Sequence, residues 1–517
     1  MTKKIYKTFA SYSFGCRVNQ AEKEMLNRQL SAVNYQYSEN NPSIYIINTC
    51  AVTQKAEREA RQLIYQTKRK WPKTKIVVTG CAATKWINEG TKIPQVDWLI
   101  DNTNKEYIAQ LLSSKLKDQR SNSKLKTKNL NTLILEAGDT GEEANIKQPK
   151  IPILKTELNA PNDRSFLGVE TLWQEKSDRK RLFVSEKFGI ETVQKRNINK
   201  YLNSGRLLLK IQDGCQRYCT FCIVPYLRGQ PKSKSIKEII REINCHTELV
   251  SASSSNTYEI PKQVLDDIRE VILTAINTEA YGYDTGESFI TLINRIIEVT
   301  KVPRISFGSI HPWSLNNDFL TLIDKMDHKG RIVNYFHIPL QSGSNKILSL
   351  MKRGYTCEEF IEKLDRLHRI NPLAFIGTDI IVGFLEETDK DFEDTYNFLK
   401  DSPISKFHVF RFSPREKTAA FYMKKRLKEP TPAQKTKRAQ VLIELSRQKY
   451  QRFLEKHIGK TFPALFMEKR IDDFQEALLD NQVPALIITT KNLTGEIETI
   501  KIEAIKEEKL IGKRDDK

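Results

Sequence analysis

The sequence predicts a mixed α/β fold in three parts: an N-terminal open parallel α/β domain, a central six-stranded β/α partial barrel and a small C-terminal β-barrel. Three patterns predict it. Short apolar runs alternate with amphipathic stretches near the N-terminus, six more such runs alternate with helical segments in the middle, and short strands with turn signals follow at the C-terminus. A length of 517 residues accommodates about three domains of about 150 residues each.

The expected domain boundaries follow these changes of pattern. The stretch after residue 112 is rich in lysine, serine and asparagine and has no sustained periodicity, which is typical of a linker. We expect most of 115–203 to be an insertion to which no chemistry is assigned. The expected parts are the N-terminal domain (1–112), the linker or insertion (113–203), the partial barrel (204–414), a basic helical connection (415–457) and the C-terminal barrel (458–517).

Three of the N-terminal strand candidates end in cysteine. Parallel strands in an open sheet bring the loops at their carboxyl ends to one edge, so Cys16, Cys50 and Cys81 are expected to meet there as a three-thiolate cluster site. The alternative is that three buried cysteines end strands by chance, because free cysteine is often buried. The expected strands are 7–16, 44–50, 75–81 and 96–100, and the expected helices are 20–30 and 54–70.

Six strand candidates that alternate with helices predict the central partial barrel. It is a truncated relative of the eightfold barrel, whose active site lies at the carboxyl ends of the strands. A serine-rich stretch at 246–262 interrupts the first helical region as a second insertion. The expected strands are 207–212, 270–274, 304–309, 334–340, 374–384 and 406–412, and the helices include 235–243, 287–299, 357–370 and 390–400.

A second group of cysteines follows the first barrel strand. Cys215, Cys219 and Cys222 have a 3-then-2 spacing, and a cubane held by three thiolates leaves one iron free for another ligand. Structural zinc is the alternative, but it takes four nitrogen or sulfur ligands, and no nearby cysteine or histidine completes that set. The spacing therefore favours a 4Fe-4S cluster. Cys245 and Cys357 are left over as ordinary thiols.

The composition indicates the kind of partner and compartment. The 84 basic and 64 acidic residues give a net charge of +20, which favours a polyanionic partner. No apolar run reaches about 18 residues and the first ten residues lack a hydrophobic segment, so we expect no membrane span or secretory signal and a cytoplasmic protein. In a reducing compartment the clustered cysteines are metal ligands rather than disulfides.

The C-terminal region combines a basic helix with short strands. The segment 424–456 is a basic amphipathic helix candidate, with Pro430 and Pro432 near its start. The strands that follow are typical of a small barrel. They are expected at 460–467, 483–490, 496–505 and 508–512.

The loop from Cys215 to Cys222 resembles the C-x3-C-x2-C loop of the radical S-adenosylmethionine (SAM) superfamily. The resemblance implies a 4Fe-4S cluster whose open iron takes the amino and carboxylate groups of SAM, and an electron from the cluster then cleaves SAM to a 5′-deoxyadenosyl radical. It also implies that Phe221 lies near the adenine. The catalytic residues and the electron donor stay unknown.

Three further motifs resemble the methylthiotransferase branch of that superfamily: FGCRVN (14–19), NTCAVT (48–53) and TGCAA (79–83). They are most similar to the enzymes that act on threonylcarbamoyladenosine in tRNA. The resemblance implies a second 4Fe-4S cluster on Cys16, Cys50 and Cys81 through which sulfur is delivered. It also implies the tRNA anticodon loop as partner, and the C-terminal barrel loosely resembles the RNA-binding TRAM barrel.

Other segments match the family by position, and some residues depart from it. YLRG (226–229), HIPLQSGSNKIL (337–348) and TDIIVGFLEET (378–388) correspond to loops that line the SAM pocket, although a single residue such as His337 or Gln341 could equally be a hydrogen-bonded core group. These departures leave open that SAM binding in this pocket is weakened. They are Ala275 and Glu386 in place of glycine, Leu385 in place of proline, and His311 in place of an acidic residue.

The predicted function is methylthiolation of C2 of N6-threonylcarbamoyladenosine, next to the anticodon, by a SAM-derived radical and a second iron–sulfur cluster. Two alternatives stay open. One is the same chemistry on N6-isopentenyladenosine of tRNA or on a ribosomal protein, and the other is a catalytically inactive RNA-binding relative.

Overall fold

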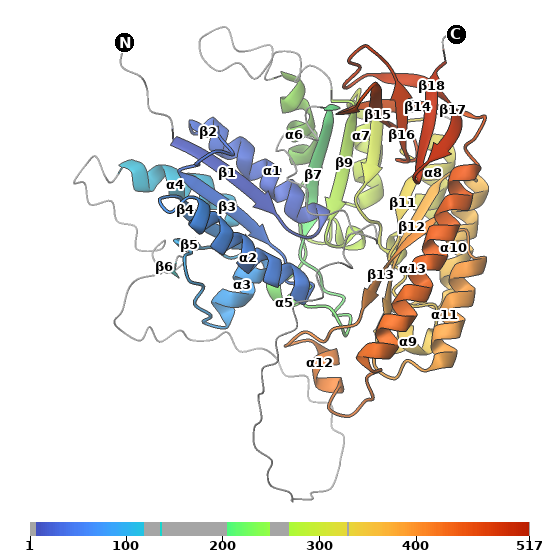
Figure 1. The fold of residues 1–517 in the computed structure, drawn as a ribbon, viewed down its shortest axis with the longest axis horizontal. Coiled ribbons are helices and arrows are strands. Elements are labelled where there is room, and N and C mark those ends of the chain that lie inside the picture. The colour runs from blue at the N-terminus through green and yellow to red at the C-terminus, as the bar shows by residue number, and fades with distance from the viewer. Residues whose placement is uncertain (1–6, 118–134, 137–203, 249–267, 328–329, 516–517) are drawn as a thin grey trace, which may run out of the picture. The chain divides into compact units, whose positions relative to one another are not determined.

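The computed structural model describes residues 7–117, 135–136, 204–248, 268–327 and 330–515 (Figure 1). All elements named below belong to one structural unit, which residues 1–137 and 198–517 form together. The insertion predicted at 115–203 lies outside the described residues except for a helix end and one short strand, and so do residues 249–262 of the second insertion. Among the described helices, none is both long and apolar enough to cross a membrane.

The N-terminal residues form a six-stranded sheet in the order β2-β1-β3-β4-β5-β6. The strands from β2 to β5 are parallel to their neighbours, and β6 is antiparallel to β5. The predicted strands and helices are confirmed, with β2, α3 and α4 in addition. The elements are β1 (Lys7–Ser13), α1 (Arg17–Ala32), β2 (Tyr35–Tyr37), β3 (Ile44–Thr49), α2 (Gln54–Lys70), β4 (Lys75–Gly80), α3 (Cys81–Asn88), β5 (Trp98–Leu99), α4 (Ile108–Lys117) and β6 (Leu135–Glu136).

The six predicted barrel strands are also confirmed, in sequence order. They form two hydrogen-bonded groups, one with β10, β9 and β7 and one with β11, β12 and β13. Backbone bonds from Ile305 to Arg331 (2.7 Å) and from Ile310 to His337 (2.9 Å) join the groups between β10 and β11. The strands are β7 (Arg206–Asp213), β9 (Glu270–Ala275), β10 (Arg304–Phe307), β11 (Tyr335–His337), β12 (Phe375–Val382) and β13 (Lys406–Arg411), with a short edge strand β8 (Lys232–Ser233).

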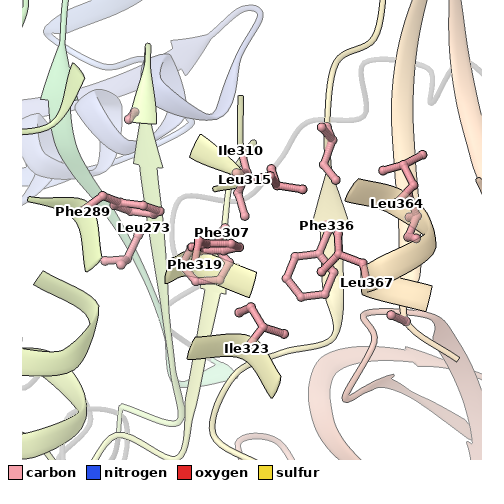
Figure 2. Packing of buried hydrophobic residues seen from close by; sticks show 14 of the residues in the cluster. Leu273, Phe289, Phe307, Ile310, Leu315, Phe319, Ile323, Phe336, Leu364 and Leu367 are labelled. Atoms are coloured by element: carbon pink, nitrogen blue, oxygen red, sulfur yellow. The ribbon is translucent and has the colours of Figure 1, made fainter. Parts of the chain in front are cut away.

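Apolar side chains between the barrel strands and their helices form the main core (Figure 2). Phe307 of β10 packs edge-on against Phe289 and Phe319, with ring centroids 5.7 and 5.8 Å apart. Two helices, α8 and α9, and the short α5 were not predicted. The helices are α5 (Val224–Arg228), α6 (Ile236–Glu248), α7 (Phe289–Val299), α8 (Asn317–Asp327), α9 (Asn345–Leu350), α10 (Cys357–Ile370) and α11 (Asp389–Asp401).

Alternate residues of the barrel strands face inward, away from this core. On β7 and β9 the inward face is covered by the N-terminal domain, because Ala21 of α1 packs against Leu208 and Ile272. Arg17, one residue after Cys16, donates to the backbone oxygen of Phe307 at 3.1 Å. Helix α1 therefore links the N-terminal cysteine edge to the interior of the barrel.

The C-terminal strands close into a five-stranded barrel in the order β14-β15-β16-β18-β17. Four strands were predicted, and β15 was missed because it carries glutamine and glutamate within a six-residue run. The long helix α13 begins at Pro432 rather than at residue 424, since proline fits the first helical turn and Thr431 caps it through the backbone N–H of Gln434. The elements are α12 (Ala419–Met423), α13 (Pro432–Glu455), β14 (Thr461–Ile471), β15 (Phe474–Leu479), β16 (Pro484–Ile488), β17 (Ile497–Lys506) and β18 (Lys509–Arg514).

A buried ion network joins this small barrel to the amino-terminal ends of the large barrel's strands. Glu270 of β9 accepts from Arg206 at 3.0 Å and lies 3.6 Å from the guanidinium of Arg304. Gln482 donates to Glu270 at 3.0 Å, and Arg304 donates to the backbone oxygen of Leu479 at 2.7 Å. Burial alone would favour the protonated acid, but Arg206 and then Arg304 lower the pKa of Glu270 to about 2.

This network predicts a specific acid sensitivity. The pKa of Glu270 is lower in the folded protein than the unfolded value of about 4.3, so its stabilisation is complete above that pH and is lost as the pH falls toward 2. Glu270→Gln should lower the free energy of unfolding at pH 7 by about 3–5 kcal/mol, because it leaves two buried arginines without a carboxylate. Urea unfolding at pH 7 and pH 3.5 measures both effects.

The exposed Glu444, which pairs with Arg447 on α13, provides the control. Glu444→Gln should leave unfolding unchanged at both pH values. If wild type and Glu270→Gln lost the same free energy of unfolding between pH 7 and pH 3.5, this pH dependence would not come from Glu270.

Candidate functional site

The structure brings the three N-terminal cysteines to one edge of the first sheet. Strands β1, β3 and β4 are adjacent and parallel, with Ser13 opposite Asn48 and Thr49 opposite Gly80. Cys16 caps α1 after β1, Cys50 follows β3 directly, and Cys81 is the first residue of α3 rather than the end of a strand. All three cysteines therefore lie where adjacent parallel strands end, and that they form one cluster site stays a prediction.

The thiols of this edge lie close enough to influence one another. Burial, followed by the neighbouring Cys81 and Cys16, raises the pKa of Cys50 to about 12. Gly15 has a φ of +83°, and a Cβ there would lie 2.7 Å from the Cys50 sulfur. All three cysteines are free of disulfides. Three free thiols at one edge of a sheet are candidate metal ligands, because a thiol gives up its proton when it binds a metal.

A buried arginine from the barrel reaches this cysteine edge. Arg228 lies at the end of α5, and its Nε donates to the Cys81 sulfur at 3.3 Å. Its terminal nitrogens donate to Asn19 at 2.6 Å, to Glu22 at 3.0 Å and to Asp213 at 2.7 Å. Arg228 therefore connects the N-terminal helix α1, the Cys81 loop and strand β7.

Arg228 belongs to a network of paired charges beside the thiols. Glu22 also accepts from Lys105 at 2.6 Å and from Lys210 at 3.2 Å, and Lys210 donates to Asp213 at 3.0 Å. Burial opposes ionisation, but Arg228 and Lys105 hold the pKa of Glu22 well below its usual range. Glu106, at 3.6 Å from Lys210, is a third carboxylate of this network and balances its three cations. Arg228 is the cation that contacts the Cys81 sulfur, where it can stabilise a thiolate.

The second cysteine trio lies in the loop between β7 and α5. The loop is closed by a bond from the Cys215 N–H to the oxygen of Gly229 at 3.1 Å and from the Cys222 N–H to the oxygen of Cys219 at 2.9 Å. Gly214 has a φ of +75°, and a Cβ there would lie 2.1 Å from the backbone oxygen of Gln230. Only glycine allows this close approach. Burial, followed by Cys219, raises the pKa of Cys222 to about 12.

An arginine also contacts this trio, and sequence reasoning missed it. Arg353 donates to the Cys219 sulfur at 3.3 Å, to the Tyr355 hydroxyl at 2.8 Å and to the backbone oxygen of Pro339 at 3.0 Å. Its guanidinium lies 4.7 Å from the ring centroid of Trp313. Each trio therefore has one buried arginine 3.3 Å from one of its sulfurs.

The two trios share a common packing environment. Ile223, which follows Cys222 directly, and Leu227 of α5 belong to the same buried cluster as Cys50 and Cys81. Asn102 donates to the backbone oxygen of Leu227 at 3.0 Å and to the Cys81 sulfur at 3.5 Å. The loop of the second trio is thus anchored in the core beneath the first.

A further arginine ties the end of the barrel to the Cys50 loop. Arg415, after β13, donates to the backbone oxygen of Ala51 at 2.7 Å and to Glu57 at 2.8 Å. Glu57 also accepts from the Trp86 indole at 2.9 Å. Neither Arg415 nor Asn102 stands out in the sequence, because each acts through a partner far along the chain.

The chain is similar to known families and to several known proteins. Residues 8–101 match the family described as "Uncharacterized protein family UPF0004", and residues 209–399 match the "Radical SAM superfamily". A threonylcarbamoyladenosine tRNA methylthiotransferase from Aquifex aeolicus is 31% identical over 88% of this chain and 92% of its own length. The chain belongs to the radical SAM methylthiotransferase family.

Two more relatives and one solved structure are similar. A threonylcarbamoyladenosine tRNA methylthiotransferase from Bacillus subtilis is 27% identical over 96% of this chain and 93% of its own. A tRNA-2-methylthio-N(6)-dimethylallyladenosine synthase from Aquifex aeolicus is 28% identical over 90% and 89%. The solved structure of the cobalamin-dependent S-adenosylmethionine radical enzyme OxsB matches this chain with a TM-score of 0.41 and 11% sequence identity. The match covers 82% of this chain and 55% of that one.

The cofactors of this methylthiotransferase family are SAM and two 4Fe-4S clusters, and the residues present fit them. Each trio consists of free thiols, and each has a guanidinium in hydrogen-bond contact with a sulfur. Hydrogen bonds to sulfur are one means by which proteins set the reduction potential of such clusters. Of the remaining cysteines, Cys357 lies apart at the start of α10, and the side chain of Cys245 lies outside the described residues.

Phe221, Leu385 and Glu386 lie in one apolar cluster or beside it. Leu385 and Glu386 are two of the residues that depart from the family pattern. Phe221 packs on the cluster that contains Met351 and the fully buried Leu385. Glu386 follows with a φ of +60°, in the left-handed region where glycine is favoured, and its N–H donates to the oxygen of Lys428 at 2.8 Å. The loop thus keeps the backbone conformation of a glycine although a glutamate occupies the position.

The other two departures lie at the ends of barrel strands. Ala275 is the buried last residue of β9. His311 stacks on Trp313, with ring centroids 6.0 Å apart, and its buried Nδ1 has no hydrogen-bond partner among the described residues. Burial, followed by Arg353 and Arg217, lowers the pKa of His311 to about 3, so a neutral imidazole stands beside two guanidinium groups.

The role of Arg228 predicts a large effect on stability. Arg228→Met should lower the free energy of unfolding by about 3–5 kcal/mol, because it removes one partner from a buried ion network. Arg447→Met, at an exposed pair on α13, is the matched control and should leave unfolding unchanged. Chemical denaturation of the three proteins measures this, and an Arg228→Met protein as stable as the control would contradict it.

Proposed function

We propose that this family member is a tRNA methylthiotransferase that replaces the C2 hydrogen of N6-threonylcarbamoyladenosine, next to the anticodon, with a methylthio group. The relative from Aquifex aeolicus, whose name specifies this substrate and which aligns over 92% of its length, carries the proposal. The motifs FGCRVN and NTCAVT support the same substrate. Acting on tRNA, the enzyme would work in the cytoplasm.

We assign the two trios to two different clusters. Cys215, Cys219 and Cys222 would hold the cluster that binds SAM, with Phe221 beside the adenine. Cys16, Cys50 and Cys81 would hold the cluster that delivers sulfur. The support is their placement at strand ends, the free thiols and the shared core beneath both loops.

The chemistry requires a radical, because an aromatic C2–H bond has neither an acidic proton nor a leaving group for acid–base catalysis to use. The bound SAM and clusters supply the radical, the sulfur and the methyl group. The chain's own residues position these groups: Arg353 and Arg228 hold one sulfur of each trio, and Arg415 ties the Cys50 loop to the barrel. Such fixed positioning is the protein's main contribution to cofactor chemistry.

The surplus of basic residues fits a nucleic-acid substrate. The net charge of +20 belongs to the chain as a whole, where basic side chains can bind the phosphate backbone; residues 458–517 of the C-terminal barrel contain 10 basic and 12 acidic side chains. A base in the single-stranded anticodon loop can be splayed out at little cost. We propose this barrel as the tRNA-binding part and 204–414 as the radical-forming part.

Iron content tests the assignment of the clusters. After anaerobic reconstitution the wild type should bind about eight irons, and a Cys16/Cys50/Cys81→Ala triple variant about four. That variant should still convert SAM to 5′-deoxyadenosine, because it keeps the second trio. The Cys215/Cys219/Cys222→Ala variant should also bind about four irons but form no 5′-deoxyadenosine.

The control is Cys357→Ala, which should keep all of the iron. A wild type that binds about eight irons but forms no 5′-deoxyadenosine would favour the inactive RNA-binding alternative. Loss of nearly all iron from either triple variant, or loss of 5′-deoxyadenosine formation from the Cys16/Cys50/Cys81→Ala variant, would contradict two separate clusters.

Nucleoside analysis tests the substrate. In tRNA from a deletion strain, mass spectrometry should find 2-methylthio-N6-threonylcarbamoyladenosine replaced by its precursor, with restoration by the wild-type gene but not by Cys215→Ala. Loss of the methylthio-isopentenyl nucleoside instead would favour the substrate named for the second Aquifex aeolicus relative. Unchanged tRNA would leave the ribosomal-protein alternative.

A further inference from the structure

A third group of side chains of metal-ligating type lies on the barrel strands, outside both cysteine trios. His337 ends β11, Asp379 is in the middle of β12 and His408 is on β13. One ligand atom from each lies within 4.8 Å of the others. Among the described residues, this is the group whose histidine and carboxylate atoms converge on one point.

The strand register places these three side chains on one face. Asp379 is directly opposite His408, and His337 is opposite Gly377, two residues before Asp379. Side chains two apart on a strand share a face. Because Ile380, next to Asp379 on β12, lies in the hydrophobic core on the other face, the trio faces the barrel interior.

The distances match those of a single-ion site. Nε2 of His337 and Nδ1 of His408 lie 3.2 and 3.4 Å from the same oxygen, Oδ1 of Asp379. Two donors on a tetrahedron, each about 2.0–2.1 Å from a zinc ion, lie about 3.3 Å apart. The three atoms would need to move little to bind one ion.

Neighbouring residues hold His337 in the orientation that binding requires. Its Nδ1 lies 3.1 Å from the Ser309 hydroxyl, which can accept the Nδ1 proton and leave the Nε2 lone pair for a metal. Gly377 makes room for the ring, since a Cβ there would lie 3.2 Å from Cδ2 of His337. Although burial opposes ionisation, His337 and His408 hold the pKa of Asp379 well below its usual range.

We propose that His337, Asp379 and His408 bind a divalent transition metal ion, such as zinc or ferrous iron, at a site separate from both iron–sulfur clusters. Two imidazoles and one carboxylate suit these ions. Three protein ligands leave a coordination position for an oxygen donor, and it is reachable because the His408 side chain is 63% exposed. The site would add a Lewis acid inside the barrel.

The test of this metal site is zinc binding by the full chain with both clusters reconstituted. Zinc is a suitable probe because its X-ray absorption edge is separate from that of the cluster iron. The holoprotein should retain one zinc per chain with unchanged iron, and nitrogen and oxygen neighbours at about 2.0–2.1 Å. Asp379→Asn and His408→Ala should each weaken zinc binding more than about 100-fold, and Ser309→Ala about 10- to 100-fold.

His368→Ala, on α10 and outside the trio, is the matched control and should bind zinc as the wild type does. Asp379→Asn is isosteric and His408 is exposed, so both variants should fold. Weaker zinc binding by them would therefore come from the missing ligand. The proposal is overturned if the wild type retains no zinc, if Asp379→Asn and His408→Ala bind it equally well, or if sulfur neighbours at about 2.3 Å place it in a cysteine trio.

Discussion

The contact on which the site depends most is the one between the buried guanidinium of Arg228 and the Cys81 sulfur, together with Glu22 and Asp213. Arg228 comes from the loop of the second trio, and all its partners except Asp213 come from the N-terminal domain. A buried ion network tolerates loss of a member poorly, because the remaining charges have no water to solvate them. This requirement holds the two cysteine loops in one arrangement.

The same network sets the electrostatics of the site. Arg228 places a buried positive charge beside Cys81, and Arg353 places a second one beside Cys219. Thiolates and the anionic clusters that they hold are stabilised by such charges. Positioning and charge stabilisation are thus carried by the same few arginines.

Close backbone approaches impose the other constraint, and they explain how the departures from the family are accommodated. Gly15 and Gly214 adopt positive φ where any Cβ would collide. Glu386 adopts a positive φ without a glycine, and Leu385 buries its side chain completely in place of a proline. The loop therefore keeps its path, while the neutral His311 beside two arginines changes the charge of the pocket.

Local pattern predicted the six barrel strands, the three N-terminal strands that precede Cys16, Cys50 and Cys81, and the six cysteines as candidate ligands, because hydrophobic alternation and ligand spacing are properties of neighbouring residues. It missed β15, whose run is short and polar, and α8 and α9, whose helical segments were not recognised. Only the tertiary structure decided that Arg228, Arg353, Arg415 and Asn102 serve the trios. Each of them makes a hydrogen bond to a residue 125 or more positions away, and no local pattern encodes which distant group a buried donor will meet.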